Sequence, residues 1–200
     1  MTRTSAQAPI LVALATVLSL TMLAFAAAPA SAGDAWRAKP AEDLLVKLTR
    51  CLRAGGKVTK TGECKGYGKG LYAKPKPTIY RSYKIGKKVA LPWAKRSAPW
   101  QGANSCWIGH SRYGSSVDSR FAAAGFKSNI NGENMGCGLY GSAKQTVIRV
   151  VRMWQAEKAW NGWHWRQIRD GDFKSFGVGV ARYGSRKTQI VVNFYGKRIP

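Results

Sequence analysis

The chain has 200 residues, which is about one domain and enough to bury a hydrophobic core without help. Its 33 Lys and Arg residues outnumber its 9 Asp and Glu residues, which gives a formal net charge of +24. This charge predicts attraction to wall polymers, acidic lipids or nucleic acid, unless it serves only to keep a secreted protein soluble; it says nothing about the fold.

Residues 1–32 have the features of a secretory signal peptide. Arg3 supplies a positive charge, residues 10–25 are apolar, and residues 30–32 (Ala-Ser-Ala) form a small-residue cleavage site. The alternative is an uncleaved membrane anchor, because residues 9–28 approach the ~20 residues that span a bilayer. The cleavage site favours removal of the leader.

No later segment is apolar enough to span a membrane. We therefore predict a secreted protein, extracellular or associated with the cell wall. Its mature part would consist of a short, mobile lead-in over residues 33–40 and one domain over residues 41–200, and we expect it to be a monomer.

Four cysteines in an exported chain predict two disulfides, with three possible pairings. We favour Cys51 with Cys64, which closes a short glycine-containing loop. We also favour Cys106 with Cys137, which ties together two segments that carry candidate site residues. Zinc binding by the cysteines is not expected, because the chain has no Cys-x-x-Cys pair.

Apolar residues at helical spacing predict a first helix over residues 44–52 that ends at a Gly-Gly pair. The Lys-, Gly- and Tyr-rich residues 57–77 predict a loop. Thr78 is expected to cap a second helix, which would end or kink near Pro92.

A short helix is predicted from Ser115 or Ser116 to Ala124, stopped by a glycine. The Asn-Gly pair at residues 131–132 predicts a turn, and residues 132–138 are expected to be extended.

The strongest predicted helix begins at Ser142, which forms a capping box with Gln145. Its apolar face runs to Trp154, and Glu157, three residues later, is expected on or beside that face.

Two strands are predicted over residues 176–182 and 188–195. Gly177 and Gly179 fall on one face of the first strand. A helix or loop can therefore approach that face closely.

Trp93, Trp100 and Trp107 lie among basic residues, an arrangement that can bind single-stranded nucleic acid by stacking. Tryptophans in a small extracellular domain more often belong to the core. Specific nucleic-acid recognition is therefore not expected.

Five motifs follow one another in the second half of the chain, and together they resemble the CAP superfamily of secreted proteins. They are Gly109-His110-Ser111, Gly132-Glu133-Asn134, Trp154-x-x-Glu157-Lys158, His164-Trp165-Arg166-Gln167-Ile168 and Gly177-Val178-Gly179-Val180. No single motif is specific, but their order is persuasive. The short ending is similar to that of the bacterial branch of the superfamily.

The resemblance implies an α+β fold, a three-layer α-β-α sandwich with a small antiparallel sheet between helices. It also implies a central cleft formed by His110, Glu133, Glu157 and His164. In some bacterial relatives the second acid lies just before the Gly-x-Gly strand, where this chain has Ser175. Glu157 is then required to fill that role.

Two neutral imidazoles, those of His110 and His164, can bind zinc or another divalent cation. The carboxylates of Glu133 and Glu157 can orient them, and either is a candidate general base. The alternative is a hydrogen-bonded polar cluster that fixes distant segments of the fold without any chemistry.

These observations lead to a secreted, non-enzymatic binding or defence-type domain that is held by its basic surface to an anionic cell-envelope polymer or acidic lipid. The alternative is a metal-assisted hydrolase acting on peptide or cell-wall substrates. A secreted nuclease would rest only on charge together with His and Glu.

Overall fold

The structure is a computed structural model that describes residues 35–102, 104–112 and 114–200. The predicted signal peptide lies outside the described residues. Within the described part of the chain, no helix is both long and apolar enough to cross a membrane.

The helices are distributed along the chain between the strands, and the described chain both begins and ends with strands. The α-helices are α1 (Lys39–Arg53), α2 (Tyr83–Ile85), α3 (Leu91–Ser97), α4 (Val117–Ala123), α5 (Ala143–Ala156) and α6 (Trp163–Arg169). Three other helical segments are the π-helix η1 (Gly86–Ala90) and the 3-10 helices η2 (Ala98–Trp100) and η3 (Glu157–Trp160). The strands are β1 (Trp36–Arg37), β2 (Lys57–Val58), β3 (Cys64–Lys65), β4 (Tyr80–Arg81), β5 (Asn131–Gly138), β6 (Ser175–Tyr183) and β7 (Lys187–Tyr195).

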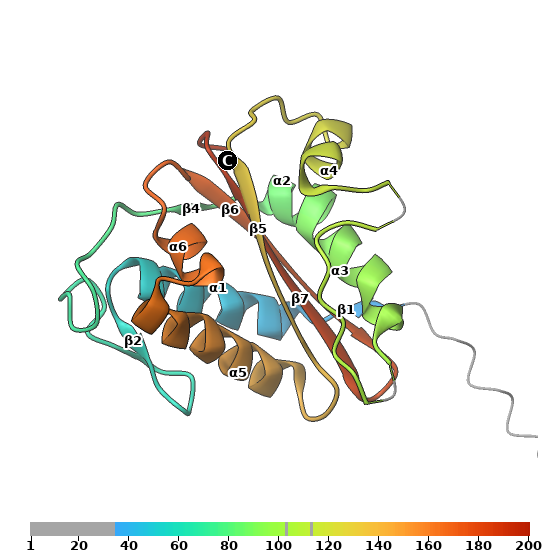
Figure 1. Cartoon of the computed structure of the whole chain (residues 1–200), viewed down its shortest axis with the longest axis horizontal. Coiled ribbons are helices and arrows are strands. Elements are labelled where there is room, and N and C mark those ends of the chain that lie inside the picture. Colours follow the sequence, from blue (N-terminus) through green and yellow to red (C-terminus); the bar gives the residue numbers. More distant parts are fainter. Residues whose placement is uncertain (1–34, 103, 113) are drawn as a thin grey trace, which may run out of the picture. The chain divides into compact units, whose positions relative to one another are not determined.

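Three long antiparallel strands form the centre of the sheet in the order β6-β7-β5 (Figure 1). The hairpin from β6 to β7 turns at Gly184, whose φ of 57° favours glycine. Two short strands extend the sheet beyond β6, where β1 pairs antiparallel and β4 pairs parallel. The predicted lead-in is thus partly a strand, because Trp36 and Arg37 pair with Arg182 and Ala181.

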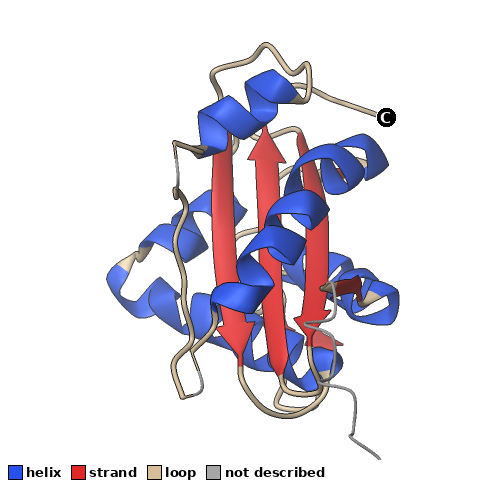
Figure 2. Ribbon diagram, turned by 90° about the vertical axis from the view of Figure 1, so that its right-hand side faces the viewer, coloured by secondary structure: helices blue, strands red, loops and turns tan. Residues whose placement is uncertain are grey.

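One face of the sheet is covered by α1, α5 and α6. Alternate residues of β7, among them Ile190, Val192 and Phe194, point into this layer, where they pack with apolar side chains such as Leu48 and Val151. Helices α2 and α3, with η1 between them, cover the opposite face, and α4 lies beside them (Figures 1 and 2). The predicted three-layer α-β-α sandwich is confirmed.

Two glycines of β6 allow the α2–η1–α3 segment to lie directly on the sheet. A Cβ atom added at Gly177 would lie 2.2 Å from the backbone nitrogen of Gly86. One added at Gly179 would lie 2.5 Å from backbone atoms of Ala90 and Leu91. The close approach predicted for these glycines is confirmed, and the approaching element is a helix.

The second helix starts later and runs further than predicted. Thr78 does not cap it, because Tyr80 and Arg81 form β4 first and the hydroxyl of Ser82 accepts the backbone N–H of Ile85 at 3.2 Å. Pro92 does not end it, because this residue falls in the first turn of α3, directly after the π-helix η1, where the hydrogen-bond pattern of the helix already changes.

The predicted turn at residues 131–132 is wrong. Asn131 and Gly132 are the first residues of β5 and pair with Tyr195 and Phe194. Gly132 leaves room for two neighbouring side chains, since a Cβ atom there would lie 2.4 Å from Oε1 of Gln167 and 2.8 Å from Cζ of Phe173. The Gly-Glu-Asn motif is therefore a segment of strand.

Both predicted disulfides, Cys51–Cys64 and Cys106–Cys137, are present. The predicted loop over residues 57–77 contains a small hairpin, in which β2 pairs with β3. The capping boxes at Ser116 and Ser142 start α4 and α5. The predictions of these two helix starts are confirmed.

A buried arginine joins α1 to the segments around α6. The guanidinium of Arg53 donates hydrogen bonds to the carbonyl oxygens of Pro77, Ile168, Asp170 and Phe173. Burial, followed by the nearby Arg169 side chain, lowers the pKa of Arg53 to about 10. Four backbone acceptors from two segments, residue 77 and residues 168–173, thus depend on one side chain.

Candidate functional site

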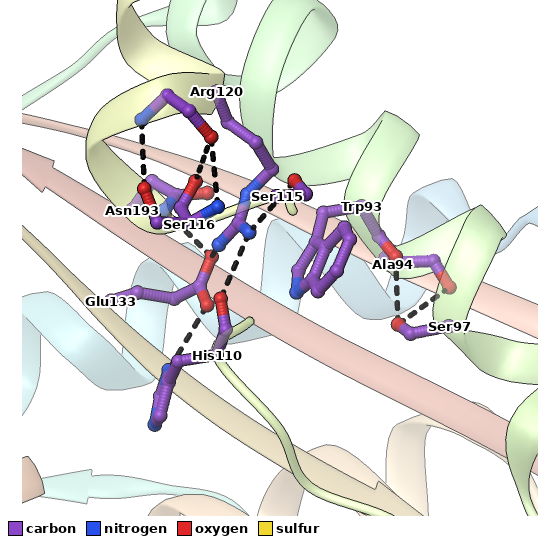
Figure 3. Close-up of polar contacts among 10 residues, drawn as sticks. Trp93, Ala94, Ser97, His110, Ser115, Ser116, Arg120, Glu133 and Asn193 are labelled. Carbon is purple, nitrogen blue, oxygen red and sulfur yellow. Dashed lines mark hydrogen bonds and ion pairs between the residues drawn. The ribbon is translucent and has the colours of Figure 1, made fainter. Parts of the chain in front are cut away.

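Glu133 is the centre of a polar group on the α3–α4 face of the sheet (Figure 3). Its carboxylate is fully buried and lies 3.0 Å from Nδ1 of His110. It also accepts hydrogen bonds from the guanidinium of Arg120 at 2.6 Å and from Nδ2 of Asn193 at 2.9 Å. Arg120 further donates to the carbonyl oxygen of His110 at 2.9 Å. One carboxylate and one guanidinium therefore hold the His110 segment in place.

The strand register explains why these groups meet. Glu133 on β5 is directly opposite Asn193 on β7, so their side chains emerge on the same face. Arg120 comes from α4, and its guanidinium carbon lies 3.9 Å from the ring centroid of Trp93 on α3. Burial lowers the pKa of Arg120, while Glu133 acts in the opposite direction. Figure 3 shows the guanidinium between the indole ring and the carboxylate.

Glu157 and His164 form a second polar group at the junction of α5 and α6. The two side chains approach within 2.6 Å, from Oε1 of Glu157 to Nδ1 of His164. The other carboxylate oxygen accepts the backbone N–H groups of His164 at 2.9 Å and of Trp165 at 3.3 Å. Glu157 therefore caps α6, whose N-cap residue Gly162 has no side chain for this purpose. The ring of His164 stacks on that of Trp154, with centroids 5.6 Å apart.

The two polar groups approach β5 from opposite faces. Neighbouring residues of a strand point to opposite sides, and Asn134, next to Glu133, donates to the carbonyl oxygen of His164 at 3.0 Å. Within the described residues, no hydrogen bond or ion pair joins a side chain of the pair His110–Glu133 to one of the pair Glu157–His164. The structure thus brings the four predicted residues together as two pairs, and one shared cleft stays a prediction.

The two histidines have the arrangement of oriented metal ligands without the rest of a metal site. In each pair Nδ1 faces a carboxylate, which leaves Nε2 as the ligand atom. Zinc sites ordinarily have three or four protein ligands. In the described part of the chain, no group of three or more His, Cys, Asp or Glu side chains is placed to hold a metal ion. The residues present therefore do not complete a zinc site of the usual kind.

Strand β5 is the last strand on its side of the sheet, and residues 106–110 follow it closely. Cys106 is linked to Cys137 of β5 by a disulfide, and His110 contacts Glu133 four residues earlier on the same strand. The two anchors fix this segment alongside the edge of the sheet.

Sequence reasoning missed three residues that hold the site together, namely Arg120, Asn134 and Asn193. Asn193 had a weak signal, because it is a polar residue at an inward-facing position of a strand. Arg120 had none, because its contact with Glu133 joins a short helix to a strand through tertiary packing.

The model of the cysteine-rich secretory protein (CAP) family matches residues 73–195 of the chain. The chain belongs to the CAP family. Three solved structures are similar to this CAP chain. A protein from Bacillus anthracis str. Ames, described as an extracellular protein containing a SCP domain, is 16% identical; the match covers 61% of this chain and 35% of that one, with a TM-score of 0.45.

NaASP2 with Zn²⁺ is 15% identical, with 79% of this chain and 80% of that one covered and a TM-score of 0.50. The CAP domain of Enterococcal PrgA is 16% identical, with 83% and 67% covered and a TM-score of 0.46. The chain thus spans about a third of the length of the Bacillus protein. No curated protein sequence is significantly similar to it. At these identities, the likeness to NaASP2 supports the CAP fold alone.

Proposed function

We propose that the chain is a non-enzymatic binding domain that acts outside the cell or at its envelope. Its cationic surface would hold it to an anionic wall polymer or to acidic lipid. Membership of the CAP family and two disulfides support an exported protein. The formal charge of +24 supports an anionic partner.

A basic groove on α5 is the observation that carries this proposal. A hollow of about 410 Å³ is lined by Lys60, Arg149 and Arg152, together with Tyr140, and by no acidic residue among those described. Neither arginine side chain has a hydrogen-bond or ion-pair partner within the described residues. A groove with three unpaired cations suits a repeating polyanion, which can place successive charges beside each of them.

The contacts of the two His–Glu pairs support a binding role over catalysis. Glu133 is occupied by donors from His110, Arg120 and Asn193, and Glu157 caps α6 through two backbone N–H groups. A general base has to be within reach of a substrate proton. Each carboxylate instead fixes a backbone segment, which is the role of a structural polar cluster.

Co-sedimentation with vesicles containing acidic lipid and with purified cell-wall material tests the proposal. The Debye length, over which charges attract each other through the solution, shortens from about 30 Å at 0.01 M salt to about 3 Å at 1 M salt. We therefore expect binding to weaken at least about tenfold over this range. Arg149→Gln with Arg152→Gln should weaken binding more than Lys65→Gln with Lys69→Gln, which removes the same charge from exposed positions elsewhere.

Binding that is absent at low salt, or that does not change with salt, would overturn the proposal. So would stoichiometric metal in the purified protein together with a peptide- or wall-hydrolysing activity that His110→Ala abolishes. That second result would establish the metal-assisted hydrolase, for which the two open Nε2 atoms are the supporting observation.

A further inference from the structure

A second pocket lies between α3 and α4, on the other side of Arg120 from the polar group of Glu133. It has a volume of about 430 Å³, within the range of small-molecule sites. Helix α3 and the end of η1 form one wall, and α4 with the segment before it forms the other. The lining residues are Lys88, Val89, Pro92, Trp93, Arg96, Ser115, Arg120, Ala123 and Ala124.

The charged lining residues of this α3–α4 pocket are all cationic. Lys88 and Arg96 are eight residues apart and so lie on one side of the η1–α3 segment, and Arg120 faces them from α4. Arg96 is close enough to contribute to the lowered pKa of Arg120. Glu133 neutralises Arg120, but Lys88 and Arg96 have no hydrogen-bond or ion-pair partner within the described residues. Two unpaired positive charges therefore remain at the pocket.

Two buried donors among the lining residues also lack partners. Trp93 is only 2% exposed, and its indole Nε1 has no hydrogen-bond partner within the described residues. The Nε of Arg120 is likewise buried without one. A buried donor without an acceptor costs about 1–3 kcal/mol. The pocket thus combines cations with an apolar wall, and no carboxylate oxygen lines it among the described residues.

We propose that the α3–α4 pocket binds the phosphate group of a small phosphate ester, with Lys88 and Arg96 as its charge partners. A phosphate carries up to two negative charges, which match two unpaired cations better than the single charge of a carboxylate does. The organic part of the ester would lie on the apolar wall formed by Val89, Pro92 and Ala123. This site is separate from the groove on α5 and does not depend on it.

Isothermal titration with inorganic phosphate and with glycerol 3-phosphate tests the proposal at constant ionic strength. We expect saturable binding of one ester per chain, tighter for the ester than for inorganic phosphate. Lys88→Gln with Arg96→Gln should weaken it at least about tenfold, because both charge-assisted contacts are lost. Arg149→Gln with Arg152→Gln removes the same charge from the α5 groove and should leave the affinity for the ester within about twofold of that of the unmodified protein.

A variant without charge change provides the second measurement. Ala123→Leu narrows the pocket from an exposed position of α4 and should also weaken binding of glycerol 3-phosphate. Vesicles containing phosphatidylglycerol show whether the phosphate group comes from a lipid or from a soluble ester. If the Lys88/Arg96 variant loses more vesicle binding than the Arg149/Arg152 variant does, the ligand is a lipid headgroup. If the Lys88/Arg96 variant loses only binding of the soluble ester, the ligand is a free phosphate ester.

Absence of saturable binding would overturn the pocket proposal. Equal weakening of ester binding by both double variants would also overturn it, because the overall positive charge of the protein would then be sufficient to explain the binding. Either result leaves salt-dependent adhesion through the α5 groove intact, so the two proposals fail separately.

Discussion

Replacing Gly179 by alanine tests whether the contact between β6 and α3 sets the spacing of two layers. The added Cβ would lie 2.5 Å from backbone atoms of Ala90 and Leu91, whereas ordinary contacts begin at 3.4 Å. The helix would have to move away by about 1 Å, because backbone atoms cannot rotate aside as a side chain does.

Overpacking of this kind costs about 1–3 kcal/mol. It also loosens the packing of neighbouring buried residues such as Trp93 and Ala94 on α3. We therefore expect Gly179→Ala to lower the free energy of unfolding by about 2–3 kcal/mol, with an unchanged slope against urea concentration.

Urea unfolding followed by circular dichroism provides the measurement, and Gly171→Ala is the matched control. A Cβ atom at Gly171 would meet nothing within 4 Å, so this change should be neutral or stabilise by up to about 1 kcal/mol through the unfolded chain. A loss below about 0.5 kcal/mol for Gly179→Ala would refute the close-contact reasoning.

Three further predictions concern charged side chains. Arg53→Met should lower the free energy of unfolding by about 3–5 kcal/mol in urea, since four backbone carbonyl oxygens lose a charged donor; a loss under about 1 kcal/mol would contradict this role. Glu133→Gln should cost about 3–5 kcal/mol in the same assay, because Arg120 is left buried without its counter-charge, and conversion of both residues to neutral ones should cost less than the single change. The hydrogen bond from Lys39 lowers the pKa of Asp43 in the folded protein. The Asp43 carboxylate therefore adds to the free energy of unfolding above about pH 4, and this addition is lost as the pH falls through the lowered folded pKa. Because Asp43 is largely exposed, Asp43→Asn should cost at most about 0.5 kcal/mol at pH 6, and acid titration of stability should show the difference vanish near pH 2.

Features set by neighbouring residues could be predicted from the sequence. The serine caps of α4 and α5 depend on residues three positions apart, and the alternation along β7 follows from the period of a strand. The glycine pair of β6 could be read as a close approach, although the sequence did not say which element approaches. The two disulfides were chosen from three pairings by loop length and by the segments they would join.

Features decided by tertiary contacts could not be predicted in this way. Thr78 and Ser82 are both acceptable caps, and only the pairing of β4 with β6 selects the second. An Asn-Gly pair favours a turn locally, but the packing of Gln167 and Phe173 against Gly132 requires a glycine in a strand.

The candidate site shows the same limit. The four His and Glu residues were located through the resemblance to the CAP superfamily, and the structure adds which carboxylate meets which imidazole. The participation of Arg120 depends on how α4 packs against β5, a distance of thirteen residues in the chain that no local pattern encodes. Long-range ion pairs of this kind require coordinates.

The position of residues 106–110 beside β5 has a consequence for handling the protein under reducing conditions. An exposed strand edge offers unpaired backbone groups to another chain, which is a common route to aggregation. Here a disulfide, the contact of His110 with Glu133 and a hydrogen bond from Arg120 keep a covering segment at that edge. Thiol reductants remove the covalent anchor, so reduced samples should associate edge to edge into larger species, whereas oxidised samples stay dispersed.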